Sequence, residues 1–282
     1  MEVTVRKEQK GGGFQMIKAA VLGSPIAHSL SPLLHSTAYR ELGIAHSYEA
    51  IEVGSGGLAD FLATLDSSWT GLSLTMPLKE EAVVLADSVD ELATRIDSAN
   101  TLHRRNGKWE ATSTDVIGFV NSLRMHEVSI AGHIVILGAG ATARAAAAAC
   151  DGLAKQITIV NRSIKRIEAM SRAVQQSELS FVDWSGVSVI EDADLVISTT
   201  PAGATDSLQL PSQVRAPFFE ALYKPWPTIA SNEWGKRGGF VIDGLDLLIH
   251  QGIAQMEIFS GVTFDNSQMY KLLRGVGISA LK

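Results

Sequence analysis

The chain of 282 residues alternates short apolar runs with longer segments in which apolar residues recur at helical spacing. In the first half, Asn106-Gly107 lies between two strand-like runs and predicts a hairpin. The predicted strands of this half are 19–22, 48–53, 72–75, 99–103 and 108–112. The predicted helices are 32–42, 58–65, 80–86 and 116–123. Ser31 suits the N-cap of the first helix, Pro32 suits its first turn and Gly43 suits its end.

The second half continues the alternation. Its predicted strands are 134–137, 157–160, 195–198, 218–222 and 240–242, and its predicted helices are 145–149, 245–259 and 268–274. The segment 245–259 is apolar over most of its circumference, which indicates a well-buried helix. Because strands that alternate with helices form parallel sheets covered on both faces, the pattern predicts an α/β fold.

Composition and charge narrow the class of protein. A hydrophobic content of 46% is ordinary for a globular α/β chain, and the net charge of −6 gives no bulk attraction for nucleic acid or an anionic membrane. No apolar run reaches the length of about 18 residues that a membrane span needs. Cys150 is the single cysteine, so no disulfide within the chain can form, and a cytoplasmic location is expected. Residues 1–15 are expected to be a mobile tail, without the apolar core of a signal peptide.

A glycine-rich turn joins the predicted strand 134–137 to the alanine-rich helix that follows. The turn reads G-x-G-x-x-A, with Gly138, Gly140 and Ala143 at the marked positions. The first glycine allows a tight turn, the second lets the backbone approach a pyrophosphate, and the small third residue lets the helix pack on the strand. The pyrophosphate then sits at the helix N-terminus, where free N–H groups favour an anion. The sequence therefore predicts a dinucleotide-binding unit.

The next strand end indicates which dinucleotide binds. An NAD-binding fold places an acid about 20 residues after the glycines, on the ribose 2′-hydroxyl. Here the strand 157–160 is followed by Asn161 and Arg162, with Lys165 and Arg166 close behind. A guanidinium pairs with a 2′-phosphate that a carboxylate would repel, so NADP is favoured over NAD. The alternative is that these cations form a solvated helix face.

Four polar clusters in the first half lie where predicted strands end. Ser29 and Ser31 stand at a helix start and can donate to a carboxylate, although both also suit a turn and a cap. Lys79 follows a strand and a proline, where it can point into a cleft or lie on the surface. Asn100 can bind ligand hydroxyls or serve a turn, and Asp115 opens a helix as a ligand group or as a cap.

Taken together, these clusters and the glycine turn resemble the shikimate dehydrogenase family. The resemblance runs from about residue 20 to residue 261, and it rests on eight segments in the family's order. The segments are GSPIAHSLSP (23–32), LTMPLKEEA (74–82), SANTL (98–102), TSTDVIGF (112–119), GAGATARA (138–145), NRSIKR (161–166), YKPWPT (223–228) and DGLDLLIHQ (243–251). It implies reversible NADPH-dependent reduction of 3-dehydroshikimate to shikimate. The implied fold is a substrate domain with a mostly parallel sheet and a Rossmann-like NADP-binding domain.

The resemblance also implies roles for single residues. Lys79 and Asp115 match the family's catalytic pair. The implied substrate-binding residues are Ser29, Ser31, Thr75, Asn100, Gln251 and Tyr223. The implied NADP contacts are Gly138, Ala139, Gly140, Ala141, Asn161, Arg162, Ser163, Arg166, Thr199 and Gly244. The implied domains are 16–117 with 245–282 for substrate and 118–244 for NADP. A monomer or homodimer acting on a small molecule is expected.

The chemistry of the implied pair agrees with the reaction. Oxidation of a secondary alcohol removes the hydroxyl proton as hydride leaves, and Lys79 can take that proton if its pKa is brought toward the working pH. Asp115 opposes that drop in pKa by stabilising the ammonium, so orienting Lys79 and binding a hydroxyl suit it better. Which of the two carries the proton stays open. No zinc-ligand spacing is present, and His28, His35 and Asp243 are interpreted as structural.

Two positions depart from the family pattern. Ser113 stands where the family usually has asparagine before the Thr-Asp pair, and Glu220 stands where it often has aspartate. Two other functions remain open. A quinate/shikimate dehydrogenase often accepts NAD and varies at the second serine and the arginine cluster, so Ser31 and Arg162 speak against it. A catalytically silent NADP-binding sensor on the same fold would be favoured by loss of Lys79 or Asp115, and both are present.

Overall fold

The computed structural model describes residues 3–4 and 16–282, and within them the chain divides into two compact units. Unit 1 holds the described residues up to Thr114 together with Leu248–Lys282, and unit 2 is Asp115–Leu247. Each boundary between the units lies three residues from the domain boundary expected from the sequence, at 114/115 instead of 117/118 and at 247/248 instead of 244/245. The expected tail, 1–15, falls outside the described residues except for Val3 and Thr4. The backbone N–H of Thr4 donates to Oε1 of Gln268 at 2.9 Å.

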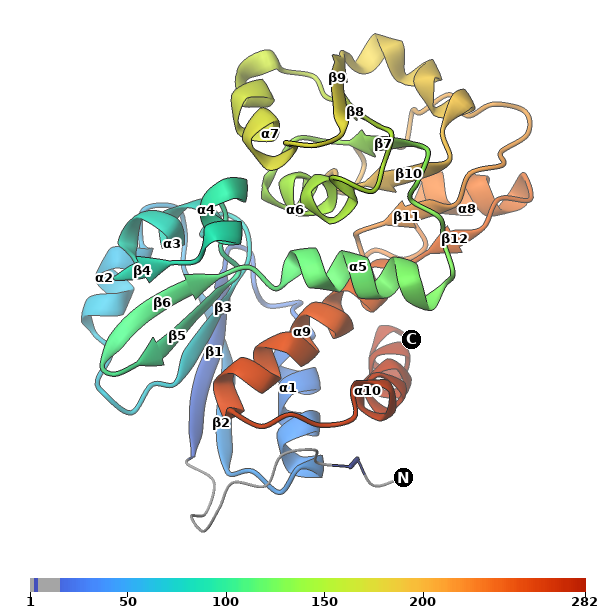
Figure 1. Cartoon of the computed structure of the whole chain (residues 1–282). Coiled ribbons are helices and arrows are strands. Elements are labelled where there is room, and N and C mark those ends of the chain that lie inside the picture. The colour runs from blue at the N-terminus through green and yellow to red at the C-terminus, as the bar shows by residue number, and fades with distance from the viewer. Residues whose placement is uncertain (1–2, 5–15) are drawn as a thin grey trace. The chain divides into compact units, whose positions relative to one another are not determined.

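Unit 1 contains a mixed sheet in the order β2-β1-β3-β5-β6-β4 (Figure 1). Strand β1 is parallel to β2 and β3, β5 is antiparallel to β3 and β6, and β4 is parallel to β6. Asn106 and Gly107 both have positive φ, 52° and 81°, so the hairpin predicted between β5 and β6 is confirmed. The strands are β1 (Ile17–Gly23), β2 (His46–Glu52), β3 (Gly71–Leu74), β4 (Ser88–Val89), β5 (Thr101–Arg105) and β6 (Lys108–Thr112).

Helices cover both faces of this sheet. Leu58, Leu78 and Ala93, from or beside α2, α3 and α4, pack with β-strand residues in one apolar core. On the other side, His35 of α1 stacks on Tyr48 of β2, and Gly71 leaves room for the ring of Phe259 in α9. The helices are α1 (Ser31–Glu41), α2 (Leu58–Ala63), α3 (Lys79–Leu85), α4 (Glu91–Ile96), α9 (Gly244–Ser260) and α10 (Asn266–Leu281).

Unit 2 contains a fully parallel sheet in the order β12-β11-β10-β7-β8-β9 (Figure 1). Numbered along the unit, this is 3-2-1-4-5-6 read from β9, the order of dinucleotide-binding Rossmann sheets. The Rossmann-like prediction is confirmed. The strands are β7 (His133–Leu137), β8 (Gln156–Val160), β9 (Glu178–Val182), β10 (Leu195–Ser198), β11 (Phe218–Glu220) and β12 (Val241–Ile242).

Helical segments cover both faces of the second sheet as well. Ile190 and Trp234 pack over β7, β10 and β11 in one core, while Phe119 of α5 meets Phe219 of β11 edge-on, with ring centroids 5.1 Å apart. The segments are α5 (Asp115–Met125), α6 (Ala141–Cys150), η1 (Ile164–Arg166), α7 (Ile167–Ala173), η2 (Trp184–Asp192) and α8 (Ile229–Lys236). Among the described residues, no helix has both the length and the apolar character to cross a bilayer.

The structure corrects the predicted start of the first helix. Leu30, not Ser31, is the N-cap of α1, and it makes no side-chain capping bond. Ser31 lies in the first turn, and its backbone N–H donates to the Ser29 hydroxyl at 3.3 Å. The physical reason is that Leu30 already has helical backbone angles, φ −83° and ψ −7°, so the helix begins one residue earlier than the hydroxyl pattern suggests.

Candidate active site

The carboxyl ends of β1 and β3 bring the first two polar clusters of unit 1 together. The backbone N–H of Ser24 donates to the carbonyl of Met76 at 3.0 Å, and that of Thr75 donates to Leu22 at 2.9 Å. Gly23 is required at this crossing, because a Cβ there would lie 2.4 Å from Cγ2 of Thr75. The loop with Ser29 and Ser31 therefore starts beside Thr75, and all three belong to unit 1.

Lys79 is fastened to the segment that carries Asn100. Lys79 is the first residue of α3 and is half-buried. Its carbonyl accepts from the N–H of Ala99 at 2.9 Å, and the carbonyl of Asn100 accepts from Leu74 at 2.7 Å. The end of β3, the start of α3 and the segment before β5 thus meet at one place, as expected for sites at strand ends.

The buried amide of Asn100 joins three distant parts of the chain. Its Oδ1 accepts from the backbone N–H of Thr114 at 2.8 Å. Its Nδ2 donates to Oγ1 of Thr114 at 2.9 Å and to Oε1 of Gln251 at 3.0 Å. Two predicted substrate-binding residues, Asn100 and Gln251, are therefore in direct contact. Since Thr114 precedes Asp115, the same amide fixes the backbone that leads into the other proposed catalytic residue.

Gln255 belongs to this network and was not predicted. Its side chain is 1% exposed, and its Nε2 donates to the carbonyl of Asn100 at 2.9 Å and to Oγ1 of Thr101 at 2.8 Å. Its Oε1 accepts from the Ser73 hydroxyl at 2.7 Å. The signal that could have found it is spacing, because residues four apart share a helix face, and Gln251 and Gln255 lie four apart in α9.

Asp115 opens α5 and begins unit 2. It is 5% exposed and lies in the first helical turn, where the helix dipole favours a negative charge. Ser113, two residues before it, is also buried, and its hydroxyl has no hydrogen-bond partner in the structure. An unsatisfied buried hydroxyl is costly, so this turn contains one polar group that does not stabilise it.

His35 and the turn before α9 make contacts that support the fold. Burial lowers the pKa of His35 to about 3, so this side chain is neutral, and its ring stacks on Tyr48 with centroids 4.1 Å apart. His28 is exposed. Oδ1 of Asp243 accepts from the N–H of Leu245 at 3.0 Å. Among the described residues, no cluster of three or more His, Cys, Asp or Glu side chains could hold a metal ion.

The glycine turn of unit 2 has the geometry that its motif requires. Gly138 has φ +105°, and a Cβ there would lie 2.8 Å from Oγ1 of Thr199. Thr199 in turn donates from this hydroxyl to the carbonyl of Leu137 at 3.0 Å. Gly140 is the N-cap of α6, and a Cβ there would meet nothing within 4 Å. The turn therefore leaves open space beside Gly140, where α6 begins with Ala141.

The basic residues after β8 lie on a short, internally bonded turn. Nδ2 of Asn161 donates to the carbonyl of Ser163 at 2.7 Å, and the Ser163 hydroxyl accepts from the N–H of Lys165 at 3.2 Å. The side chains of Arg162 and Arg166 are exposed. The turn follows β8, which pairs with β7, so it lies at the same edge of the sheet as the glycine turn. This arrangement can hold a dinucleotide and its 2′-phosphate.

Tyr223 and Gly244 lie on neighbouring segments of unit 2. Tyr223 is half-buried and follows β11. A Cβ on Gly244 would lie 2.2 Å from the carbonyl oxygen of Ala221, and the N–H of Gly244 donates to Leu222 at 3.3 Å. The structure thus gives Gly244 a packing role against the segment that leads to Tyr223.

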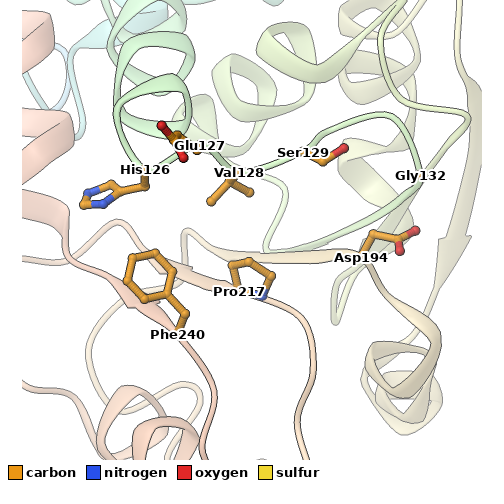
Figure 2. Close-up of a pocket in the computed structure, with 8 residues that line it drawn as sticks. All are labelled: His126, Glu127, Val128, Ser129, Gly132, Asp194, Pro217 and Phe240. Carbon is orange, nitrogen blue, oxygen red and sulfur yellow. The ribbon is translucent and has the colours of Figure 1, made fainter.

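Unit 2 also has a hollow of about 340 Å³ at the opposite edge of its sheet (Figure 2). Its lining includes Gly132, Asp194, Pro217 and Phe240, the residues that directly precede β7, β10, β11 and β12. Ligands of open α/β sheets bind outside the carboxyl ends of the strands, whereas this hollow lies at the amino ends. The predicted site residues do not line it.

The fold and the glycine turn of unit 2 define a two-unit α/β protein with a Rossmann-type dinucleotide-binding domain. Two family models match the chain: the shikimate dehydrogenase substrate binding domain over residues 21–102, and shikimate / quinate 5-dehydrogenase over residues 124–208. The shikimate dehydrogenase (NADP(+)) of Staphylococcus epidermidis is 31% identical over 274 residues, 94% of this chain and 98% of that protein. The chain belongs to the shikimate dehydrogenase family.

Solved structures agree with this assignment. The crystal structure of Mycobacterium tuberculosis shikimate dehydrogenase superposes with a TM-score of 0.82 at 35% identity, covering 92% of this chain and 99% of that one. The shikimate 5-dehydrogenase of Thermus thermophilus, in complex with NADP(H) and shikimate, has a TM-score of 0.81 at 30% identity, covering 93% of this chain and all of that one. The predicted family and two-domain fold are confirmed.

Proposed function

We propose that this protein is an NADP-dependent shikimate dehydrogenase, which reduces 3-dehydroshikimate to shikimate reversibly. The observation that carries the proposal is a full-length relationship: a relative with this name covers 94% of the chain. Lys79 and Asp115 are present at the motif positions of the family's catalytic pair. A cytoplasmic location and a monomeric or homodimeric state stay predictions from the sequence.

The residues at the glycine turn fit NADP. Gly140 has open space where a Cβ would stand, α6 offers free N–H groups to a pyrophosphate, and exposed Arg162 and Arg166 can pair with a 2′-phosphate. The contacts proposed for NADP also include Gly138, Ala139, Ala141, Asn161, Ser163, Thr199 and Gly244. When bound, the nicotinamide accepts hydride from shikimate or returns it to the ketone.

The protein's own residues bind the substrate and move the proton. Ser29 and Ser31 donate to the substrate carboxylate, and the nearby start of α1 adds attraction for an anion. Thr75, Asn100 and Gln251 hold the ring hydroxyls, and Tyr223 is a further proposed substrate contact. The hydrogen bonds of Asn100 support this role. They join its amide to Thr114 and Gln251, so the side chains of Asn100 and Gln251 are held in place beside each other.

Lys79 and Asp115 act on the hydroxyl that is oxidised. As hydride leaves the carbon, the hydroxyl proton passes to one of the two side chains, and in the reverse direction the same group supplies it. Asp115 also orients the Lys79 ammonium by charge. Both side chains therefore act at the reacting hydroxyl. The pH dependence of turnover in Lys79 and Asp115 variants identifies which of them carries the proton.

A second candidate is oxidation of quinate, because the model that matches residues 124–208 is described as shikimate / quinate 5-dehydrogenase. Ser31 and Arg162 favour shikimate and NADP. The test measures reduced nicotinamide with shikimate and with quinate, each with NADP and with NAD. Shikimate with NADP is expected to give the highest kcat/KM. A preference for quinate with NAD would favour the second candidate, and no turnover with any pair would favour a silent NADP-binding protein.

A further inference from the structure

Strand β11 ends in a carboxylate that is completely buried. Glu220 is 0% exposed and lies in register beside Ser198 of β10, after two buried phenylalanines. Burying an ionisable carboxylate costs free energy unless its oxygens accept hydrogen bonds. The proposed reaction gives Glu220 no direct role, so its partners indicate what it does.

Both oxygens of Glu220 bind the segment that follows the strand. Oε1 accepts from the backbone N–H of Leu222 at 3.3 Å, and Oε2 accepts from the Thr228 hydroxyl at 3.2 Å. Thr228 is the N-cap of α8, where its Oγ1 accepts from the N–H of Ser231 at 3.1 Å. One carboxylate therefore fastens both ends of the segment from Leu222 to Thr228.

This segment carries Tyr223. Its start is also held by main-chain bonds, since the N–H of Ala221 donates to Ser198 at 2.9 Å and the carbonyl of Leu222 accepts from Gly244 at 3.3 Å. Its middle, 224–227, is exposed. The bond between Glu220 and Thr228 is thus a side-chain link that closes the segment onto the end of the strand.

We propose that Glu220 is a positioning residue, whose carboxylate holds the segment 221–228 in the conformation that presents Tyr223 to the bound substrate. This inference rests on the proposed function for the role of Tyr223. The length of the side chain matters: a glutamate reaches both Leu222 and Thr228, whereas an aspartate is one methylene shorter.

The first test compares Glu220→Gln and Glu220→Asp with the control Glu233→Gln, an exposed glutamate of α8 that pairs with Lys236. Activity is measured at pH 8, because burial raises the pKa of Glu220 to about 7 and the side chain is ionised above that value. A charged hydrogen bond is worth about 1.5–3 kcal/mol, so losing one should lower kcat/KM for shikimate roughly 10- to 100-fold. The loss should include a raised KM, with NADP affinity changed less than about twofold. A purely structural role would reduce the active fraction, which lowers kcat at an unchanged KM, and that result would overturn the inference.

A double-mutant cycle tests whether Glu220 acts through Tyr223. In a Tyr223→Ala background, Glu220→Gln should raise the KM for shikimate no further. Full additivity of the two substitutions would overturn the inference.

Hydrogen exchange separates this inference from the proposed function. Peptides covering 221–228 should exchange faster in Glu220→Gln than in the wild type, while peptides covering β7 and β8 should be unchanged. Unchanged exchange at 221–228 would overturn the positioning role even if shikimate is the substrate. If the wild type does not oxidise shikimate but exchange at 221–228 is still faster in Glu220→Gln, the proposed function is rejected while the positioning of the segment by Glu220 is supported. If Glu220→Gln does not fold, Thr228→Val removes the same link and should show the same local increase.

Discussion

The hydrogen bonds of Gln255 around Asn100 allow the loss of stability in Gln255→Leu to be predicted. The substitution keeps the size of the side chain but removes its bonds to the Asn100 carbonyl, Thr101 and Ser73. A buried polar group left unsatisfied costs about 1–3 kcal/mol. Each of the three partners keeps another hydrogen bond. Ser73, for example, still accepts from the Tyr48 hydroxyl. The expected loss in the free energy of unfolding is therefore about 3 kcal/mol, below the upper limit for three orphaned groups.

The assay is urea unfolding of the wild type, Gln255→Leu and the control Gln213→Leu, in which an exposed glutamine is replaced. The control should stay within about 0.5 kcal/mol of the wild type. Gln255→Leu should also raise the KM for shikimate, because the Asn100 backbone loses a support. A loss of less than about 1 kcal/mol would refute the reasoning that these three bonds are needed.

Further predictions concern four other side chains. Lys79→Met should lower turnover by roughly two to four orders of magnitude with NADP affinity retained, and unchanged turnover would remove Lys79 from the mechanism. Arg162→Ala should weaken NADP binding more than NAD binding in fluorescence titrations, and equal weakening would exclude a contact with the 2′-phosphate. Burial raises the pKa of Glu220 from 4.5 to about 7, so the folded state binds more protons between these values and stability falls as pH rises through them. At 1.36 kcal/mol per pH unit, the stability of Glu220→Gln relative to wild type should rise by ~3 kcal/mol between pH 4.5 and pH 8 in urea unfolding, and a flat difference would contradict the buried carboxyl. Burial raises the pKa of Cys150 to about 12, so native protein should resist alkylation by iodoacetamide, and rapid labelling would place this thiol at the surface.

Much of the fold was accessible from the sequence because its signals are local. The run 134–137 with Gly138 and Gly140 predicts a strand, a turn and a helix, and the structure has β7, a positive φ at Gly138 and α6 in that order. Asn106-Gly107 likewise fixes the hairpin. Such signals depend on backbone conformations that few residues adopt, so they survive without knowledge of the tertiary contacts.

Elements that depend on tertiary packing were missed. Helices α4, α7 and α8 and strands β4 and β9 are short, with eight residues or fewer, and β4 has only two residues. Four of the five residues of β9 are only half-buried, and the strand is held by its pairing with β8. Helix α10 is longer than predicted at both ends: it begins at Asn266, after its N-cap Asp265, and it continues to Leu281. Here distant partners, rather than local propensity, decide the structure.

The site shows the same division. The resemblance to the family names Asn100 and Gln251 as site residues. It does not show that they are in contact or that Gln255 supports Asn100, because Gln251 and Gln255 lie 151 and 155 positions from Asn100 along the chain. The cap at Ser31 was wrong, since a hydroxyl before a proline suits a cap and a first turn equally well. The sequence indicates candidate side chains for the chemistry, and packing decides which of them are in contact.

A crystal structure of the protein with shikimate and NADP bound would test the central claim most directly. We expect Nζ of Lys79 and a carboxylate oxygen of Asp115 to lie within about 3 Å of the same ring hydroxyl, on the carbon that faces the nicotinamide. We also expect the substrate carboxylate to accept hydrogen bonds from Ser29 and Ser31. A bound shikimate whose hydroxyl meets neither Lys79 nor Asp115, or a nicotinamide directed away from that carbon, would contradict it.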